Sequence, residues 1–156
     1  MAANSLTMRS ETDLLGSMQI SNNAYYGIQT QRAMDNFQLS GKKLKQHPEL
    51  IQALAQVKAA CAQANNKQKL LDNDKTNAIC SAAVKVVNGD YDDQFLIDMI
   101  QGGAGTSSNM NINEVLANVG LELMGHEKGQ YALLHPNTDV NMSQSTNDVY
   151  PTAVRL

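Results

Sequence analysis

Apolar residues recur every three or four positions over much of the chain, a spacing that is typical of amphipathic helices. The clearest stripe consists of Leu50, Leu54, Val57, Cys61 and Ala64. Pro48 and Glu49 precede it and favour a first helical turn, because Pro lacks an N–H group and Glu complements the helix dipole. The pattern therefore predicts a helix over about 48–65.

Similar signals predict further helices over about 29–37, 73–88 and 107–124, and from about 145 onward. Asp72 or Asn73 can cap the helix before Ile79, and the Asn88-Gly89 pair is typical of a left-handed C-cap. The segment 95–100 is short, apolar and partly β-branched, which favours extended backbone. Turns and short extended pieces are expected over about 13–28, and loops over 41–46 and 126–144. The pattern is that of a mainly α domain with short extended segments near the N-terminus and around 95–100.

The composition narrows the functions that the chain can have. It has 156 residues, 42% of them apolar and 17% charged, which suits one globular domain and argues against disorder. The net charge is −3 and the twelve basic residues form no stripe, so nucleic acid is not expected as a partner. No apolar run approaches the roughly 18 residues of a membrane span, and the N-terminus lacks the apolar core of a secretory signal.

The two cysteines indicate a reducing compartment. Cys61 and Cys80 both fall on apolar faces of predicted helices. We interpret them as reduced core thiols rather than as a disulfide or metal ligands, which favours the cytoplasm.

A glycine-rich segment leads into the helix predicted at 107–124. Gly102, Gly103 and Gly105 allow a ligand to approach the backbone, and Thr106, Ser107 and Ser108 follow at the helix start. Free N–H groups and the helix dipole make such a start a site for a carboxylate or phosphate. No lysine follows as it does in a nucleotide P-loop. The alternative is a glycine turn in which Ser and Thr cap the helix in the ordinary way.

Four asparagines lie along the same predicted helix. Asn109 and Asn113 share a face, and Asn111 and Asn118 are about two turns apart. Asn is a poor helix former, and a buried Asn is costly unless it is hydrogen-bonded. We therefore expect these side chains to be paired with backbone or with a ligand.

A second polar cluster, Gln144–Asp148, lies at the start of the last predicted helix. It offers Ser145, Thr146 and Asn147 in succession, with Arg155 as the only basic side chain nearby in sequence. Two helix starts with hydroxyls and amides suit a small dianion held by directional hydrogen bonds. The alternative is that Ser145 is an ordinary N-cap, with Asp148 completing an arrangement like a capping box.

Four motifs together resemble the aspartase/fumarase superfamily: YYGIQT, GGAGTSSNMNINEVLAN, HPNTDVN and QSTNDVYPTA. They occur in the family's order and at its intervals, and the resemblance runs from about Asp13 to Leu156. GGAGTS and QSTND are closest to the corresponding motifs of aspartases, whereas HPN is closer to the motif of fumarases. The resemblance implies the N-terminal domain of this fold, a homotetrameric enzyme and no organic cofactor, and we assign no metal ligands in this chain.

The implied reaction is the reversible elimination of ammonia from L-aspartate to give fumarate. A general base removes a Cβ proton, and the carbanion is stabilised as the aci form of the neighbouring carboxylate. Matched motif by motif, the residues that would bind the dicarboxylate substrate are Thr106, Ser107, Ser145, Thr146 and Asn147. His135 and Asn137 match the family's accessory anion site, although Thr138 stands at its acidic position and Asp139 follows. A lone loop histidine with a purely structural role is the alternative.

The family's catalytic serine lies on a loop with the pattern SSxMPxKxN, which does not occur in this chain. We therefore assign no catalytic residue here and expect the 156-residue chain to be an inactive N-terminal part of a longer enzyme. The expected organisation is a flexible N-terminus over 1–12, a lyase domain over 13–142, and the start of a central-bundle helix over 143–156. Fumarase is the nearest alternative function, and a non-catalytic anion-binding or scaffold domain is the alternative of another class.

Overall fold

A computed structural model describes residues 7–156 of the chain. Two strands and five longer helices follow in the order β1 Met8–Asp13, β2 Gly16–Ser21, α1 Ile28–Asn36, α2 Pro48–Lys67, α3 Asn73–Val87, α4 Thr106–Leu123 and α5 Thr146–Arg155. Three short turns of helix lie between them: η1 Leu44–Gln46, η2 Asp92–Gln94 and the π-helical η3 Pro136–Val140. The mainly α fold predicted from the sequence is confirmed.

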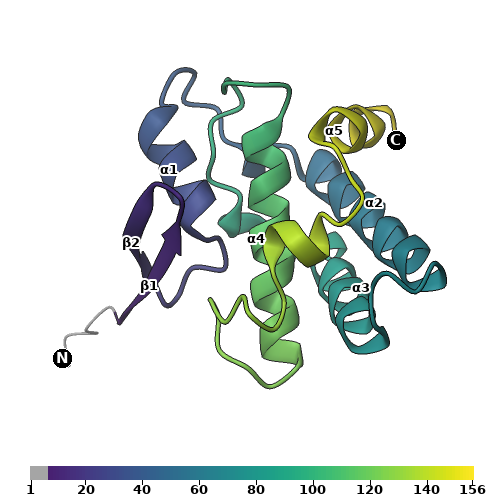
Figure 1. Cartoon of the computed structure of the whole chain (residues 1–156). Helices are drawn as coiled ribbons and strands as arrows, with labels where there is room; N and C mark the ends of the chain where they lie inside the picture. The colour runs from purple at the N-terminus through teal and green to yellow at the C-terminus, as the bar shows by residue number, and fades with distance from the viewer. Residues whose placement is uncertain (1–6) are drawn as a thin grey trace.

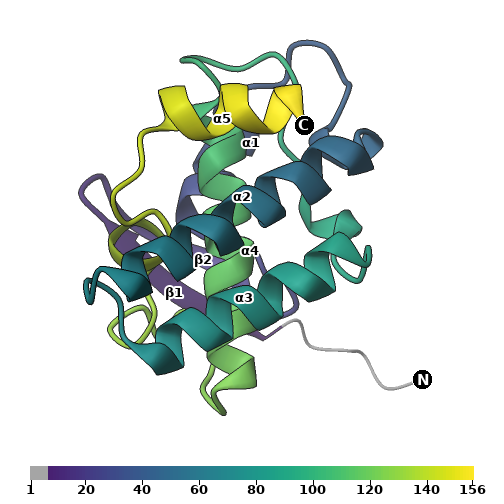
Figure 2. The same ribbon diagram turned by 90° about the vertical axis from the view of Figure 1, so that its right-hand side faces the viewer.

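Helix α4 is the centre of the domain (Figure 1). Every side chain from Asn111 to Leu121 is buried, so this helix has no solvent-facing side over that length. The β1–β2 hairpin and α1 lie on one side of it, and α2 and α3 lie on the other (Figure 1). Helix α5 crosses one end of α4 and α2 near the C-terminus (Figure 2). The starts of α4 and α5 are therefore neighbours in space.

Local sequence signals place the helices well. The Asp72 carboxylate accepts the Lys75 N–H at 2.8 Å, and Gly89 follows α3 with a φ of +86°. Cys61 and Cys80 are free thiols, as predicted, but they are half-buried rather than enclosed in the core. No helix in the described part of the chain is both long and apolar enough to span a membrane.

The N-terminal segment differs from the prediction. The sequence predicts a flexible segment over 1–12, but residues 8–12 belong to strand β1, whose partner in the antiparallel hairpin is β2. Arg9 explains the order, because its guanidinium donates to the carbonyls of Ser21, Ala24 and Tyr26 at 2.7–2.9 Å. Residues 1–6 of the predicted flexible segment lie outside the described residues.

The segment 95–100 is extended but forms no regular strand, since its only β-bridge joins Lys43 to Asp98. The buried Asp98 carboxylate accepts the N–H groups of Leu39, Ser40 and Gly41 at 2.9–3.1 Å, and the Ser40 hydroxyl as well. The Ser40 hydroxyl and the N–H groups of Ile100, Ser40 and Gly41 hold the pKa of Asp98 well below its usual range. Backbone hydrogen bonds of 2.8–3.0 Å also join this segment to residues 42–45, so the Asp98 side chain adds to a short antiparallel pairing.

Candidate functional site

The start of α4 is built by two glycines with left-handed backbone. Gly105 is the N-cap with φ +85°, and Gly103 has φ +75°. A Cβ atom at Gly105 would lie 2.4 Å from Cγ of Tyr150 on α5. Both the backbone conformation and the close approach of α5 therefore require glycine at position 105.

Unpaired amides remain at this helix start. Gln101 accepts the Ser108 N–H at 2.9 Å and donates to the Ser108 hydroxyl at 3.0 Å. Within residues 7–156, the N–H groups of Thr106 and Ser107 have no hydrogen-bond acceptor. The N-cap makes no side-chain bond, so ordinary capping by Ser or Thr does not explain the segment. Two free amides at the positive end of a buried helix form a potential anion site.

A pocket of about 620 Å³ opens beside this helix start. Its walls come from the β-hairpin, α1, α4 and the segment around η3, and its lining residues are Thr12, Asp13, Leu14, Ile28, Gln29, Thr106, Met110, Glu114, Tyr131, His135, Pro136 and Asn137. The fold thus brings Thr106 together with His135 and Asn137, which the sequence assigns to separate sites.

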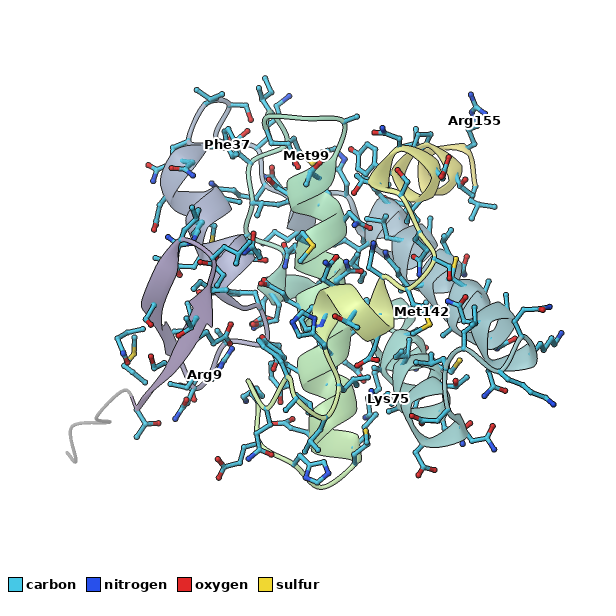
Figure 3. All side chains as sticks on the ribbon, viewed as in Figure 1. Arg9, Phe37, Lys75, Met99, Met142 and Arg155 are labelled. Atoms are coloured by element: carbon cyan, nitrogen blue, oxygen red, sulfur yellow. The ribbon has the colours of Figure 1, made fainter. Side chains whose placement is uncertain are left out.

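His135 has a structural contact on one ring nitrogen. Its Nδ1 accepts the N–H groups of Asn137 and Thr138 at 3.0 and 3.1 Å, which caps η3. Nε2 is therefore the nitrogen left for a ligand in the pocket. Asp139, two residues after the HPN motif, is buried and pairs with Lys75 at 2.9 Å (Figure 3). Its carboxylate also accepts the His135 N–H at 2.8 Å, so it stabilises the start of η3.

Two carboxylates lie in the pocket wall, and both are already bonded. Glu114 accepts the N–H groups of Gly27, Gln29 and Thr30 at 2.8–3.0 Å and so caps α1, whose N-cap glycine has no side chain. Burial raises the pKa of Glu114 to about 7, although these hydrogen bonds oppose the shift. Asp13 pairs with Arg32 at 2.8 Å, and the hydrogen bond from that guanidinium lowers the pKa of Asp13.

The lining residues include neither lysine nor arginine. An anion in this pocket would depend on hydroxyl, amide and imidazole donors of this chain, and on any cation supplied from elsewhere. Among residues 7–156, no three His, Cys, Asp or Glu side chains are grouped in a way that could hold a metal ion.

The second predicted cluster does not line this pocket. Ser145 caps α5 by accepting the Asn147 N–H at 3.2 Å, so the N-cap part of that alternative is confirmed, but within residues 7–156 the Asp148 carboxylate does not bond back to Ser145 as a capping box requires. The Asn147 side chain borders a separate pocket of about 460 Å³ that also includes Arg155. Thr146 connects the two helix starts, because its hydroxyl accepts the Asn109 amide of α4 at 3.2 Å.

The four asparagines of α4 are buried, and the side-chain N–H groups of all four donate to other parts of the protein, whereas Oδ1 of Asn109, Asn111 and Asn113 accepts no hydrogen bond within residues 7–156. Asn109 and Asn113 donate to Asn141 at 2.9 and 3.1 Å. Asn111 donates to the Gln94 carbonyl at 3.2 Å, and Asn118 donates to the Tyr25 carbonyl at 2.8 Å. The expectation of backbone partners is therefore met for Asn111 and Asn118, whereas Asn109 and Asn113 bond to a side chain.

Sequence reasoning missed three polar residues of this region: Lys58, Glu114 and Asn141. Lys58 interrupts the apolar stripe of α2, four residues after Leu54 and three before Cys61, and this could have identified it as a buried lysine. Glu114 directly precedes the apolar residues Val115, Leu116 and Ala117 of α4. No local pattern distinguishes Asn141 from its neighbours in the loop.

Comparison with known proteins finds similar chains among the lyases. An aspartate ammonia-lyase of Pseudomonas aeruginosa is 59% identical over 148 residues, and that of Escherichia coli K12 is 51% identical over 150. These matches cover 95–96% of this chain and 31% of each relative, so the chain spans about a third of their length. A fumarate lyase:delta crystallin structure from Brucella melitensis matches 96% of this chain and 35% of its own, with TM-score 0.94 and 54% identity.

A more distant structure, a class II fumarase from Schistosoma mansoni, aligns with TM-score 0.86 and 34% identity over 94% of this chain and 31% of its own. The lyase family matches residues 16–156, a range that contains α1 to α5 and every predicted site residue. The resemblance seen in the four motifs thus extends over β2 and all the helices, and the chain belongs to the lyase family.

Proposed function

We propose that the protein containing this chain is an aspartate ammonia-lyase, which reversibly eliminates ammonia from L-aspartate to give fumarate. The observation that carries the proposal is the high identity to curated aspartate ammonia-lyases over nearly the whole chain. The free amides at the start of α4 support it independently, because they suit the carboxylate on which charge develops.

In the proposed reaction a base takes a proton from Cβ, and the electron pair passes into the neighbouring carboxylate. The C–N bond then breaks, and ammonia leaves as the double bond of fumarate forms. Donors that bond the charge-rich carboxylate more strongly than the ground state lower the barrier. In this proposal the Thr106 hydroxyl and the N–H groups of Thr106 and Ser107 are such donors.

Ser145, Thr146 and Asn147 are proposed to bind the other end of the substrate. Their support is the contact between the two helix starts, through Asn109 and Thr146 and through the packing of Tyr150 on Gly105. His135 and Asn137 are proposed as an accessory anion site in the pocket beside Thr106. The catalytic base is proposed to be a serine outside residues 1–156, as the family resemblance implies.

A homotetramer and a cytoplasmic location belong to the same proposal. The free thiols Cys61 and Cys80 support the location, because an oxidising compartment favours disulfides. Light scattering of the purified full-length protein tests the tetramer, and cell fractionation tests the location.

The decisive experiment assays full-length protein with L-aspartate and with L-malate, following fumarate by its ultraviolet absorbance. Turnover of aspartate is expected, and turnover of malate alone would support the second candidate, a fumarase. The motif His135-Pro136-Asn137, which resembles that of fumarases, favours this second candidate. Turnover of neither substrate would leave a non-catalytic anion-binding or scaffold domain. The 156-residue chain alone is expected to be inactive.

A further inference from the structure

Lys58 on α2 is fully buried, at 0% exposure, which is unusual for a lysine. It lies on the apolar face of α2, and no carboxylate within residues 7–156 is within ion-pair distance of it. Burial of an unpaired ammonium costs free energy, and an apolar side chain of similar size is often equally stable or more stable in such a place. Fold stability alone therefore does not account for a lysine here.

The ammonium reaches the turn that leads into α5. Nζ of Lys58 donates to Asn141 Oδ1 and to Gln144 Oε1, both at 2.8 Å. Asn141 in turn donates to the Gln144 carbonyl at 3.0 Å, and Gln144 donates to the carbonyls of Val140 and Met142 at 2.9 and 3.1 Å. Residues 140–144 are thus folded around the end of one lysine side chain.

This turn has a strained backbone and a second tie to α2. Ser143 has a φ of +60°, a left-handed conformation that is uncommon outside glycine. Asn65 of α2 donates to the Met142 carbonyl at 2.9 Å, and Figure 3 shows Met142 on the side of η3 that faces α2 and α3. Strained residues persist where surrounding contacts hold them, so α2 fixes this turn.

The same network reaches both helix starts of the proposed site. Asn141 Oδ1 accepts not only Lys58 but also Asn109 and Asn113 of α4, and Asn109 donates onward to the Thr146 hydroxyl. A change at Lys58 therefore acts on the orientation of α5 relative to α4 without contact with any ligand.

We propose that Lys58 is a positioning residue, which holds the turn 141–144 so that Ser145, Thr146 and Asn147 stand in binding geometry beside the start of α4. The proposal rests on the proposed function for the site that these residues serve. It differs from that function in assigning a role to a side chain of α2 that lies outside both pockets.

The test compares Lys58→Met with Lys67→Met in the full-length protein, since Lys67 is exposed on the same helix. A displacement of the order of 1 Å at a site costs about 10²-fold in rate, so kcat/KM for aspartate should fall by up to about 100-fold in Lys58→Met. It should stay unchanged in Lys67→Met. The thermal unfolding temperature of Lys58→Met should stay within a few degrees of the parent.

Hydrogen exchange provides a readout that does not depend on turnover. In Lys58→Met the amides of residues 141–149 should exchange faster, whereas those of α3 should not change. Faster exchange throughout α2 and α3 would indicate a merely structural lysine and would overturn the proposal, and so would unchanged exchange and kcat/KM. If the parent enzyme does not act on aspartate, the proposed function fails, and the exchange pattern alone decides the role of Lys58.

Gln144→Leu is the second variant, because it leaves the residues of α2 unchanged and removes one acceptor of Lys58 together with the Gln144 bonds to the carbonyls of Val140 and Met142. It should accelerate exchange over the same residues and lower kcat/KM in the same direction. Together with Lys58→Met, it should lower kcat/KM by less than the product of the two single effects. If Lys58→Met does not fold, Gln144→Leu decides: local acceleration supports the proposal, and unchanged exchange overturns it.

Discussion

The substitution Gly105→Ala tests whether the contact between α4 and α5 shapes the proposed site. The residue has φ +85°, and an added Cβ would lie 2.4 Å from Cγ and 2.6–2.7 Å from both Cδ atoms of Tyr150. Left-handed backbone costs a non-glycine residue about 1–2 kcal/mol. Overpacking adds about 1–3 kcal/mol, because the ring, and α5 with it, must move. The total expected loss of stability is about 2–5 kcal/mol.

Gly125→Ala provides a matched control. Gly125 follows α4 with φ +82°, and an added Cβ there would meet nothing within 4 Å, so only the backbone cost applies. Its expected loss is therefore about 1–2 kcal/mol. Thermal unfolding of the full-length variants gives the stability difference, and steady-state kinetics with aspartate gives kcat/KM. Only Gly105→Ala should lower kcat/KM markedly, because only that change displaces the start of α5.

The double variant Gly105→Ala with Tyr150→Ala separates strain from clash. Without the ring, the alanine at 105 should cost no more than the alanine at 125. Equal stability losses and equal kcat/KM for Gly105→Ala and Gly125→Ala would refute the reasoning, since they would show that the approach of Tyr150 does not constrain this position.

Three further predictions concern the site and its supports. Thr106→Ala and Asn147→Ala should each lose roughly 2–4 kcal/mol of transition-state stabilisation in kcat/KM, and unchanged values for both would make the clusters structural. Glu114→Ala should lower the free energy of unfolding by about 3 kcal/mol, because it leaves buried amides of α1 without an acceptor, as denaturant titration would reveal. The pKa of Asp98 is lowered from 3.8 in the folded state, so its contribution to stability is present above that pH and is lost as the pH falls further. The stability difference between the parent and Asp98→Asn should therefore shrink in acid.

A control variant or a refuting outcome accompanies each of these predictions. Glu122→Ala, at the partly exposed end of the same helix as Glu114, should cost less than about 1 kcal/mol. Equal losses for the two glutamates would contradict the capping role of Glu114. A stability difference for Asp98→Asn that does not vary with pH would mean that the charge of Asp98 is not what holds its loop.

The helices were predictable because their signals are local. The start and end of α3 follow from Asp72 and Gly89, which act on the backbone within a few residues of themselves. Strand β1 was missed because Arg9, which fixes its end, bonds to carbonyls 12–17 residues away. The extended segment around Asp98 was predicted, but its backbone pairing with residues 42–45 and the loop amides that bond to Asp98 were not.

The candidate site was predictable only in its parts. Thr106 follows a glycine loop, and Ser145 opens a helix with typical capping residues, so both positions could be identified from the sequence. The residues that lie near them in space could not be identified in this way, since Glu114, for example, caps a helix that begins more than 80 residues earlier in the chain. The pocket that joins Thr106 to His135 exists only because α1, α4 and η3 pack together.

The sequence by itself determined the helical periods, the caps, the glycine-rich start of α4 and the motifs of a lyase. The tertiary structure decided which polar groups are used internally and which remain free. Lys58 and Asn141 are 83 residues apart, and Asn118 and Tyr25 are 93 apart, so no local pattern could pair them. A buried polar group must find a partner wherever the packed chain supplies one. Here the side-chain N–H groups of the α4 asparagines find partners within the fold, whereas Oδ1 of Asn109, Asn111 and Asn113 has none among the described residues, and the amides of Thr106 and Ser107 stay free at the pocket.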